Sequence, residues 1–165
     1  MSARVASCQC GNVRFRAAGK PILGAVCYCD DCQAAAHRLE ALPGAPPILT
    51  QGGGTPYILY RKDRFACLSG GEHLKDIRLR DGAPSRRIVA TCCNTAMALD
   101  FEKGHWMSVF APRFGADAPP LQMRIQTRFK PKDATLPSDL PVYASFPPKF
   151  MAKLLRARIA MLFGA

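Results

Sequence analysis

Apolar and polar residues alternate over short segments of the chain, which is the pattern of half-buried β-strands. Residues 12–16, 97–101 and 121–129 follow this two-residue period, and the third segment is the longest and the most regular. Shorter apolar runs that also favour strands complete the pattern, at residues 22–26, 57–60, 65–68, 74–79 and 87–92. The sequence therefore predicts a mainly β fold.

Helical spacing of apolar residues is confined to two segments. Residues 32–39 favour a short helix, for which Asp30 or Asp31 is expected to be the N-cap. Residues 149–163 place apolar side chains at helical spacing among lysines and arginines, which predicts a basic amphipathic helix at the C-terminus. We expect this helix to pack on its own domain or on a second subunit in a homodimer, with a membrane surface as the lesser alternative.

The length of 165 residues is that of one domain. Thirteen glycines and fourteen prolines indicate many turns, and the triple glycine at 52–54 favours a plain turn because it lacks the Lys-Ser/Thr of a phosphate loop. Proline is frequent between residues 131 and 148. We therefore expect a domain at residues 1–130, followed at 131–165 by a Pro-rich linker and the basic helix.

The chain carries a net charge of +11, and residues 123–165 hold eight basic and two acidic residues. This balance favours anionic partners, but no basic-aromatic motif indicates a specific nucleic acid. No apolar run approaches the roughly 18 residues of a membrane span. Residues 5–8 resemble a lipoprotein cleavage box, yet only seven residues precede Cys8, too few for a signal peptide. We expect a cytoplasmic protein, in which cysteines remain reduced.

Seven of the eight cysteines lie in three tight groups. Cys8 and Cys10 form a C-x-C pair followed by a glycine, which is half of a zinc site. A second pair from a distant part of the chain has to complete such a site. Cys92 and Cys93 are the candidates, because the turn at residues 81–82 delivers them at the end of a strand.

The middle group combines C-x-C with C-x-x-C and offers three thiolates within six residues, from Cys27, Cys29 and Cys32. Structural zinc sites have four protein ligands, whereas catalytic sites have three and keep one position for water or substrate. The amides at the start of the following helix favour thiolates over thiols. This group therefore predicts an open zinc site.

The remaining candidate ligands are weaker. Cys67 is expected to pack as a small apolar residue on a strand. His37, His73 and His105 do not lie at ligand spacing from a cysteine pair, and His37 is the least unfavourable of the three.

The cysteine motifs together resemble the glutathione-dependent formaldehyde-activating enzyme (GFA) family, which also includes centromere protein V. The resemblance covers residues 7–110, and the Cys-Asp-Asp-Cys-Gln and Cys-Cys-Asn-Thr variants look like a bacterial branch of that family. It rests on Cys8-Gln9-Cys10-Gly11, Cys27-Tyr28-Cys29-Asp30-Asp31-Cys32-Gln33, Gly53-Gly54-Thr55 and Cys92-Cys93-Asn94-Thr95.

The resemblance implies a β-tent fold of small coiled β-sheets that carries two zinc ions. One zinc is structural in that family and is held by the first C-x-C and a later C-x-x-C-G-T, matched here by Cys8, Cys10 and Cys93. The other is held by the three cysteines that match Cys27, Cys29 and Cys32. It is the site proposed for the chemistry of glutathione and formaldehyde, which gives S-hydroxymethylglutathione.

One departure from the family motif concerns Cys92. The first cysteine of the late C-x-x-C falls at Ala90 in this chain, and Cys92 lies directly beside Cys93 instead. Three arrangements follow: Cys92 completes the first zinc site, completes the second site and makes it four-coordinate, or remains free. The first of these is the preferred interpretation.

Two functional hypotheses remain. The first is a zinc-dependent carbon–sulfur lyase, similar to S-hydroxymethylglutathione synthase, that acts on an adduct of glutathione or another thiol at the open three-cysteine site. The second is a non-catalytic, zinc-stabilised binding module whose basic tail recruits an anionic partner. The second hypothesis requires both metals to be coordinatively saturated.

Overall fold

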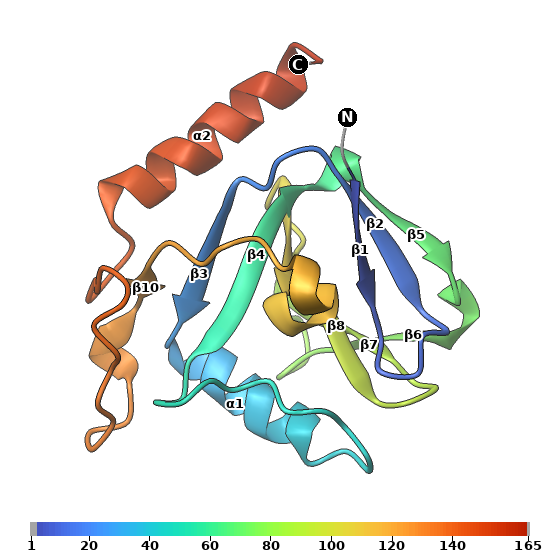
Figure 1. The fold of residues 1–165 in the computed structure, drawn as a ribbon, viewed down its shortest axis with the longest axis horizontal. Helices are drawn as coiled ribbons and strands as arrows, with labels where there is room; N and C mark the ends of the chain where they lie inside the picture. The colour runs from blue at the N-terminus through green and yellow to red at the C-terminus, as the bar shows by residue number, and fades with distance from the viewer. Residues whose placement is uncertain (1–2, 165) are drawn as a thin grey trace.

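The computed structural model describes residues 3–164 and contains two β-sheets and two α-helices (Figure 1). The mainly β fold class is confirmed, as are the short helix after the second cysteine group and the helix at the C-terminus. The helices are α1 (Asp30–Glu40) and α2 (Pro148–Leu162). The strands are β1 (Ala3–Ser7), β2 (Arg14–Ala18), β3 (Leu23–Cys27), β4 (Thr55–Arg61), β5 (Phe65–Ser69), β6 (Leu74–Ile77), β7 (Ser85–Ala90), β8 (Thr95–Phe101), β9 (Trp106–Phe110) and β10 (Arg124–Ile125).

The larger sheet has the strand order β10-β3-β4-β9-β8-β7-β6, and the smaller one has the order β1-β2-β5. Among the strands of residues 3–164, every pairing is antiparallel except that of β10 with β3, in which Ile125 lies opposite Cys27. The sequence pattern did not predict β1 or β9, although β9 lies in the middle of the larger sheet between β4 and β8. The topology brings the end of β3, where the second cysteine group begins, close to β10 and β4.

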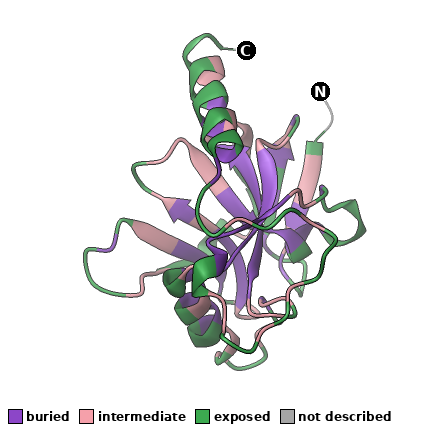
Figure 2. Cartoon of the chain, turned by 90° about the vertical axis from the view of Figure 1, so that its left-hand side faces the viewer, coloured by how far each residue is buried: buried purple, intermediate pink, exposed green. Residues whose placement is uncertain are grey.

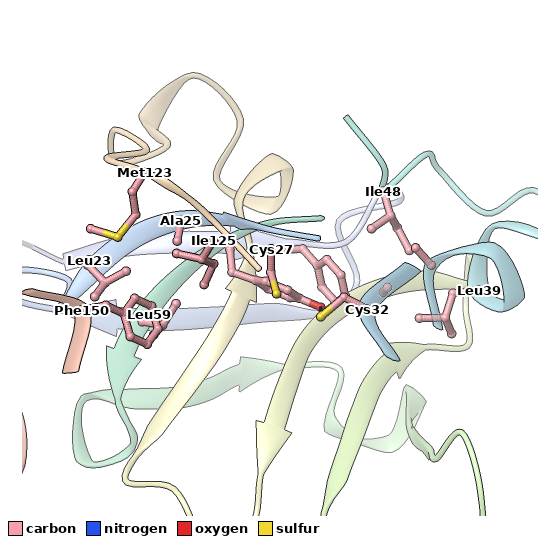
Figure 3. Close-up of a cluster of buried hydrophobic side chains, with 14 of the residues drawn as sticks. Leu23, Ala25, Cys27, Cys32, Leu39, Ile48, Leu59, Met123, Ile125 and Phe150 are labelled. Carbon is pink, nitrogen blue, oxygen red and sulfur yellow. Dashed lines mark hydrogen bonds between the residues drawn. The ribbon is translucent and has the colours of Figure 1, made fainter. Parts of the chain in front are cut away.

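The two faces of the larger sheet pack into separate hydrophobic clusters. Successive side chains of a strand point to opposite faces, so Tyr57 and Leu59 of β4 join one cluster and Ile58 and Tyr60 join the other. The first cluster includes Leu39 of α1 and continues along the sheet to α2 (Figure 3). The second cluster includes side chains of the smaller sheet. Each face therefore supports its own group of cysteines.

Helix α2 contacts the rest of the chain along one side only. Phe150 and Leu154 are buried in the first hydrophobic cluster, and the Nε2 atom of His105 lies 2.8 Å from the carbonyl oxygen of Leu154. The Nζ atom of Lys153 also donates a hydrogen bond to the side chain of Gln122 at 2.5 Å. The opposite side is exposed, and the end of the helix extends away from the sheets (Figure 2). Within residues 3–164, no helix is long and apolar enough to cross a membrane.

The prediction of a long strand at residues 121–129 is wrong. Only Arg124 and Ile125 form a strand, Gln126 takes a left-handed backbone conformation with a φ of 57°, and a 3-10 helix follows at Thr127–Phe129. The alternation does not reflect a half-buried strand, because one of its polar positions is not at the surface. The guanidinium of Arg124 is buried and donates a 2.6 Å hydrogen bond to Asp139. A polar position in the pattern is thus turned toward the following segment of the chain instead of toward solvent.

The prediction of an aspartate N-cap for α1 is also wrong. The helix begins at Asp30, earlier than the apolar spacing indicated, and its N-cap is Cys29. Asp30 and Asp31 lie in the first turn, where their charges interact favourably with the helix dipole. The carbonyl oxygen of Cys29 accepts hydrogen bonds from the backbone amides of Cys32 and Gln33, at 3.0 and 3.1 Å.

The triple glycine forms a turn that packs against the end of β3. The amide of Gly53 donates to the carbonyl of Thr50, and the amide of Thr50 donates to the carbonyl of Gly54. A Cβ atom at Gly54 would lie only 2.5 Å from the ring of Tyr28 and from a methyl group of Val26. This close approach requires glycine at position 54.

Candidate metal centres

Four thiols from two distant turns meet beside the smaller sheet and form the four-thiol cluster. Cys8 and Cys10 lie in the turn between β1 and β2, and Cys92 and Cys93 lie in the turn between β7 and β8. The four sulfurs all lie within 4.8 Å of one another. The structure thus places Cys92 with Cys8 and Cys10, which corresponds to the first of the three arrangements considered for it.

The spacing of these sulfurs fits a tetrahedral ion. The Sγ atom of Cys8 lies 3.5 Å from that of Cys10 and 3.9 Å from that of Cys92, and the sulfurs of the adjacent Cys92 and Cys93 are also 3.9 Å apart. Four ligands at the zinc–sulfur bond length of about 2.3 Å lie about 3.8 Å apart along the edges of the tetrahedron. The cluster therefore matches a closed zinc site.

Hydrogen bonds to the four-thiol cluster hold its ligands in place. The amide of Val13 donates to the sulfur of Cys8 at 3.2 Å, and the hydroxyl of Thr95 lies 3.0 Å from the sulfur of Cys93. Burial acts to raise the pKa of the Cys93 thiol, but the hydrogen bonds from Thr95 and from the backbone outweigh it and lower this pKa to about 6. The lowered pKa favours the thiolate form of Cys93, which is the form that binds metal ions.

The second group of cysteines lies on the opposite face of the larger sheet and forms the three-thiol cluster. Cys27 ends β3, Cys29 is the N-cap of α1, and Cys32 lies in the first turn of that helix. Their sulfurs lie within 4.8 Å of one another. In Figure 3 the sulfurs of Cys27 and Cys32 lie within the apolar cluster, between Leu23 and Phe150 on one side and Leu39 and Ile48 on the other.

The surroundings of the three-thiol cluster shift the pKa values of its thiols in opposite directions. Hydrogen bonds from the thiols of Cys27 and Cys32 and the nearby charge of Arg87 lower the pKa of Cys29, to about 3. Hydrogen bonding with the thiols of Cys27 and Cys29, burial, and the like charge of these neighbours raise the pKa of Cys32. The hydroxyl of the buried Tyr57 donates to the sulfur of Cys32 at 3.9 Å. Three close thiols, one of them with a strongly lowered pKa, form the kind of soft donor set that zinc prefers.

A cleft of about 440 Å³ opens directly onto the three-thiol cluster. All three cysteines line it, and Asp31, Ser85, Arg87 and Ser108 add polar atoms. The rest of the lining is almost entirely apolar. It comes from the strands of the larger sheet and from α2, and includes Leu59, Leu99, Trp106, Phe150, Met151 and Leu154.

Each thiol cluster has one buried arginine beside it. The surroundings of these two arginines indicate whether negatively charged, metal-binding thiolates fit the structure. Arg87 is 2% exposed and Arg113 is 8% exposed, and the Nε atom of each has no hydrogen-bond partner. Neither arginine forms an ion pair with a carboxylate in the part of the chain that the structure describes. A buried guanidinium without a counter-charge is costly.

The thiols of the two clusters are the groups whose negative charge acts on these arginines. The positive charge of Arg87 acts to lower the pKa of Cys29 in the three-thiol cluster. Burial lowers the pKa of Arg113, and the charges of Cys93 and Cys8 in the four-thiol cluster oppose this shift. Three or four thiolates around one divalent ion leave a net negative charge, so a neighbouring arginine fits both clusters when they hold zinc.

The remaining candidates lie elsewhere. Cys67 is on strand β5 as expected, but its side chain is exposed, so the prediction that it packs as an apolar residue is wrong. Neither thiol cluster includes His37, His73 or His105. Sequence reasoning missed Arg87, Arg113 and the cleft. Strand periodicity gives no signal for a buried arginine, and the apolar spacing of residues 149–163 does not show which surface of the domain α2 packs on.

Residues 3–42 match the family model described as glutathione-dependent formaldehyde-activating enzyme. This segment holds Cys8, Cys10 and the whole three-thiol cluster, so the resemblance noted from the cysteine motifs is confirmed. No curated protein matches the chain. A Rhodobacter sphaeroides protein with a crystal structure is similar at 12% sequence identity and a TM-score of 0.49, over 84% of this chain and 98% of the other.

Proposed function

We propose that this GFA-like chain is a zinc enzyme that forms and cleaves the carbon–sulfur bond between a thiol and an aldehyde. The observation that carries the proposal is the contrast between its two clusters. Four thiols surround one centre beside the smaller sheet, whereas three thiols line a cleft large enough for a small molecule. Closed sites of the first kind are structural, and three-ligand sites of the second kind leave a position for substrate.

In this function Cys27, Cys29 and Cys32 hold the zinc ion. Zinc bound there supplies a Lewis acid that stabilises a substrate thiolate and polarises a carbonyl oxygen. Arg87 balances the negative charge of the thiolates, and Tyr57 donates its hydroxyl hydrogen bond to Cys32. Burial raises the pKa of Tyr57 well above its usual value, so this hydroxyl remains protonated at neutral pH.

The reaction forms one bond and needs no oxidant or leaving group. The sulfur of the thiol attacks the carbonyl carbon of the aldehyde, which forms the carbon–sulfur bond and opens the carbonyl π bond. The proton lost by the thiol goes to the carbonyl oxygen, and the product is a hydroxyalkyl thioether. The reverse reaction, in which the adduct splits into thiol and aldehyde, is that of a carbon–sulfur lyase.

The four-thiol cluster has a structural role in this proposal. It joins the turn between β1 and β2 to the turn between β7 and β8, two segments that are far apart in the sequence. Because such a site binds metal only when the chain is folded, its binding free energy contributes to the stability of the fold.

The alternative of a non-catalytic zinc module requires a fourth protein ligand at the three-thiol cluster. Within the described residues, no Cys, His, Asp or Glu joins this group, and Asp31 instead forms a 3.3 Å ion pair with Arg80. The open position and the adjoining cleft therefore favour catalysis over a purely structural role.

Exchange NMR with ¹³C-formaldehyde tests the proposed function. A panel of thiols that includes glutathione is mixed with formaldehyde, and the rates of adduct formation and cleavage are measured with zinc-loaded protein. We expect acceleration by the wild type and none by Cys32→Ser, while Cys67→Ser keeps the wild-type rate because Cys67 lies in neither cluster. If no thiol in the panel reacts faster with wild-type protein than with the Cys32→Ser variant, the catalytic proposal is wrong.

A further inference from the structure

The chemistry of the cleft differs from what glutathione requires. Glutathione carries two carboxylates, one ammonium group and two amides, all of which need polar partners when they leave water. Apart from the thiols, the polar side chains that line the cleft are Asp31, Tyr57, Ser85, Arg87 and Ser108. Among the described residues that line the cleft, Arg87 is the one cationic side chain; it is 2% exposed, and its guanidinium donates a 3.2 Å hydrogen bond to the backbone carbonyl of Asp31. The cleft lining thus offers one buried cation, already engaged with the backbone, for two carboxylates.

The cysteine sulfurs and the apolar wall of the cleft belong to one cluster of side chains. Phe150 and Leu59 are buried in the same apolar cluster as Cys27 and Cys32 (Figure 3). Leu99 and Trp106 of the larger sheet pack against that cluster and also line the cleft. A ligand whose reacting atom reaches the thiols therefore places the rest of its body against hydrocarbon and aromatic rings.

Helix α2 forms the rim of this cleft. Phe150 and Leu154 are buried, whereas Met151 is 54% exposed and still lines the cleft. Phe146, which lies just before the helix, is also partly exposed and lines it. The cleft therefore reaches solvent beside α2, and an apolar ligand that enters covers side chains that are otherwise in contact with water.

We infer that this cleft binds a compact apolar ligand, an aromatic or aliphatic thiol or its aldehyde adduct, in preference to glutathione. The inference rests on the proposed function, because it takes the three-thiol cluster as the place where the sulfur reacts. It also assigns α2 to the substrate site, as the apolar wall on the side of the cleft that faces solvent.

Two independent signals report the binding of such a ligand. Trp106 is the only tryptophan of the chain and lines the cleft, so its fluorescence reports that the cleft is filled, whatever happens at the metal. Cobalt in place of zinc gives an absorption spectrum that changes when a thiol joins the three-thiol cluster. The four-thiol cluster is saturated by its own cysteines and adds a constant background.

The experiment titrates cobalt-loaded protein with benzyl mercaptan, with benzyl alcohol and with glutathione. We expect benzyl mercaptan to change both signals and to bind at least tenfold more tightly than glutathione. Benzyl alcohol, which has the same apolar body without the thiol, is expected to change the fluorescence only.

Two variants on the same helix provide a matched comparison. Met151 and Leu155 are 54% and 61% exposed, but only Met151 lines the cleft, and neither belongs to the buried core. Met151→Ala is expected to weaken the binding of benzyl mercaptan several-fold, and Leu155→Ala to leave it unchanged. Because both side chains are exposed, neither change is expected to unfold the protein.

The possible results separate the inference from the proposed function. If glutathione changes the cobalt spectrum and binds as tightly as benzyl mercaptan, or if the two variants behave alike, the inference is overturned and the proposed function stands. If both benzyl compounds change the fluorescence of Trp106 but no thiol changes the cobalt spectrum, the apolar ligand class is supported and the proposed function is overturned. If no benzyl compound changes either signal, the inference is wrong.

Discussion

The sulfur of Cys92 lies 3.4 Å from the sulfur of Cys10, although the two residues are 82 positions apart in the sequence. The contact joins the turn after β1 to the turn after β7. The turn that contains Cys92 and Cys93 includes Asn94 in a left-handed conformation with a φ of 50°. In this turn two adjacent cysteines direct their sulfurs into one cluster, which the sequence motif alone did not show.

The placement of Cys92 predicts the metal content of two variants. Wild-type protein purified under reducing conditions is expected to contain two zinc ions per chain, and Cys92→Ser one, because serine is a poor ligand for zinc. The matched control is Cys67→Ser, which is expected to keep both ions, because the thiol of Cys67 is exposed, donates to the carbonyl oxygen of Ser69 and belongs to neither cluster. Elemental analysis checks the counts. A Cys92→Ser protein with two ions would show that Cys92 is not a ligand.

The cysteine groups could be predicted from the sequence because their ligands are close together along the chain. Cys27, Cys29 and Cys32 need only the end of a strand and the first turn of a helix to bring their sulfurs together, and both elements were predicted. The pairing with Cys92 was one of three alternatives, because it depends on the register of β7 and β8. The spacing of cysteines within one motif contains no information about a contact between residues that are 82 positions apart, such as Cys10 and Cys92.

The predictions for residues 121–129 and for Cys67 failed because burial and backbone conformation there do not follow the local alternation of apolar and polar residues. Arg124 occupies a polar position of a regular alternation, yet its guanidinium is buried against Asp139, which lies in the segment expected to be a linker. Cysteine is a residue type that is usually buried, but Cys67 lies on β5, which is an edge strand of the smaller sheet, and its side chain is exposed. In both cases the neighbours that decide burial come from distant parts of the chain.

Gly54 predicts a steric effect on stability. Gly54→Ala is expected to lower the free energy of unfolding by about 1 to 3 kcal/mol, because the new methyl group meets the ring of Tyr28 and the side chain of Val26 at 2.5 Å. Gly71→Ala is the control, since a Cβ atom there meets only the sulfur of Cys67, at 3.8 Å. Urea denaturation of the zinc-loaded proteins measures both changes. Equal stability of the two variants would contradict the packing described for the turn at residues 52–54.

Asp100 predicts how stability depends on pH. Its carboxylate is buried on β8 and forms ion pairs with Lys62 at 2.7 Å and with Arg86 at 2.9 Å. Burial acts to raise the pKa of Asp100, but the hydrogen bonds from Lys62 and Arg86 outweigh it, and this pKa lies below its usual value. The stabilisation is therefore complete above the unfolded-state pKa of about 3.9, and it is lost as the pH falls through the lower pKa of the folded state.

The substitution Asp100→Asn tests this dependence. At pH 7 we expect it to lower the free energy of unfolding by about 2 kcal/mol, because two cations lose their buried partner. The difference from wild type is expected to shrink once the pH falls below about 4. Asp76→Asn is the control, since Asp76 also pairs with Arg86 but is 44% exposed, and a change of about 0.5 kcal/mol or less is expected. A deficit for Asp100→Asn that does not change with pH would exclude the ionic explanation.

The two buried arginines predict separate effects on the two metal ions. If each guanidinium balances the charge of its own cluster, Arg87→Met weakens zinc binding at the three-thiol cluster, and Arg113→Met weakens it at the four-thiol cluster. Groups next to the ligands of a metal typically change its affinity by about 10- to 100-fold. Lysine at either position keeps the charge, so Arg87→Lys and Arg113→Lys are expected to recover part of the loss.

Competition with a chromophoric chelator measures these affinities in proteins that keep a single cluster. The Cys92→Ser background isolates the three-thiol cluster, and the Cys32→Ser background isolates the four-thiol cluster, so each arginine variant is measured twice. Equal weakening at both clusters would indicate a general loss of stability instead of local charge balance. Unchanged affinity at both would show that the thiols do not supply the counter-charge of these arginines. A loss confined to the neighbouring cluster is the result expected if the structure pairs Arg87 with Cys29 and Arg113 with Cys8 and Cys93 through their charges.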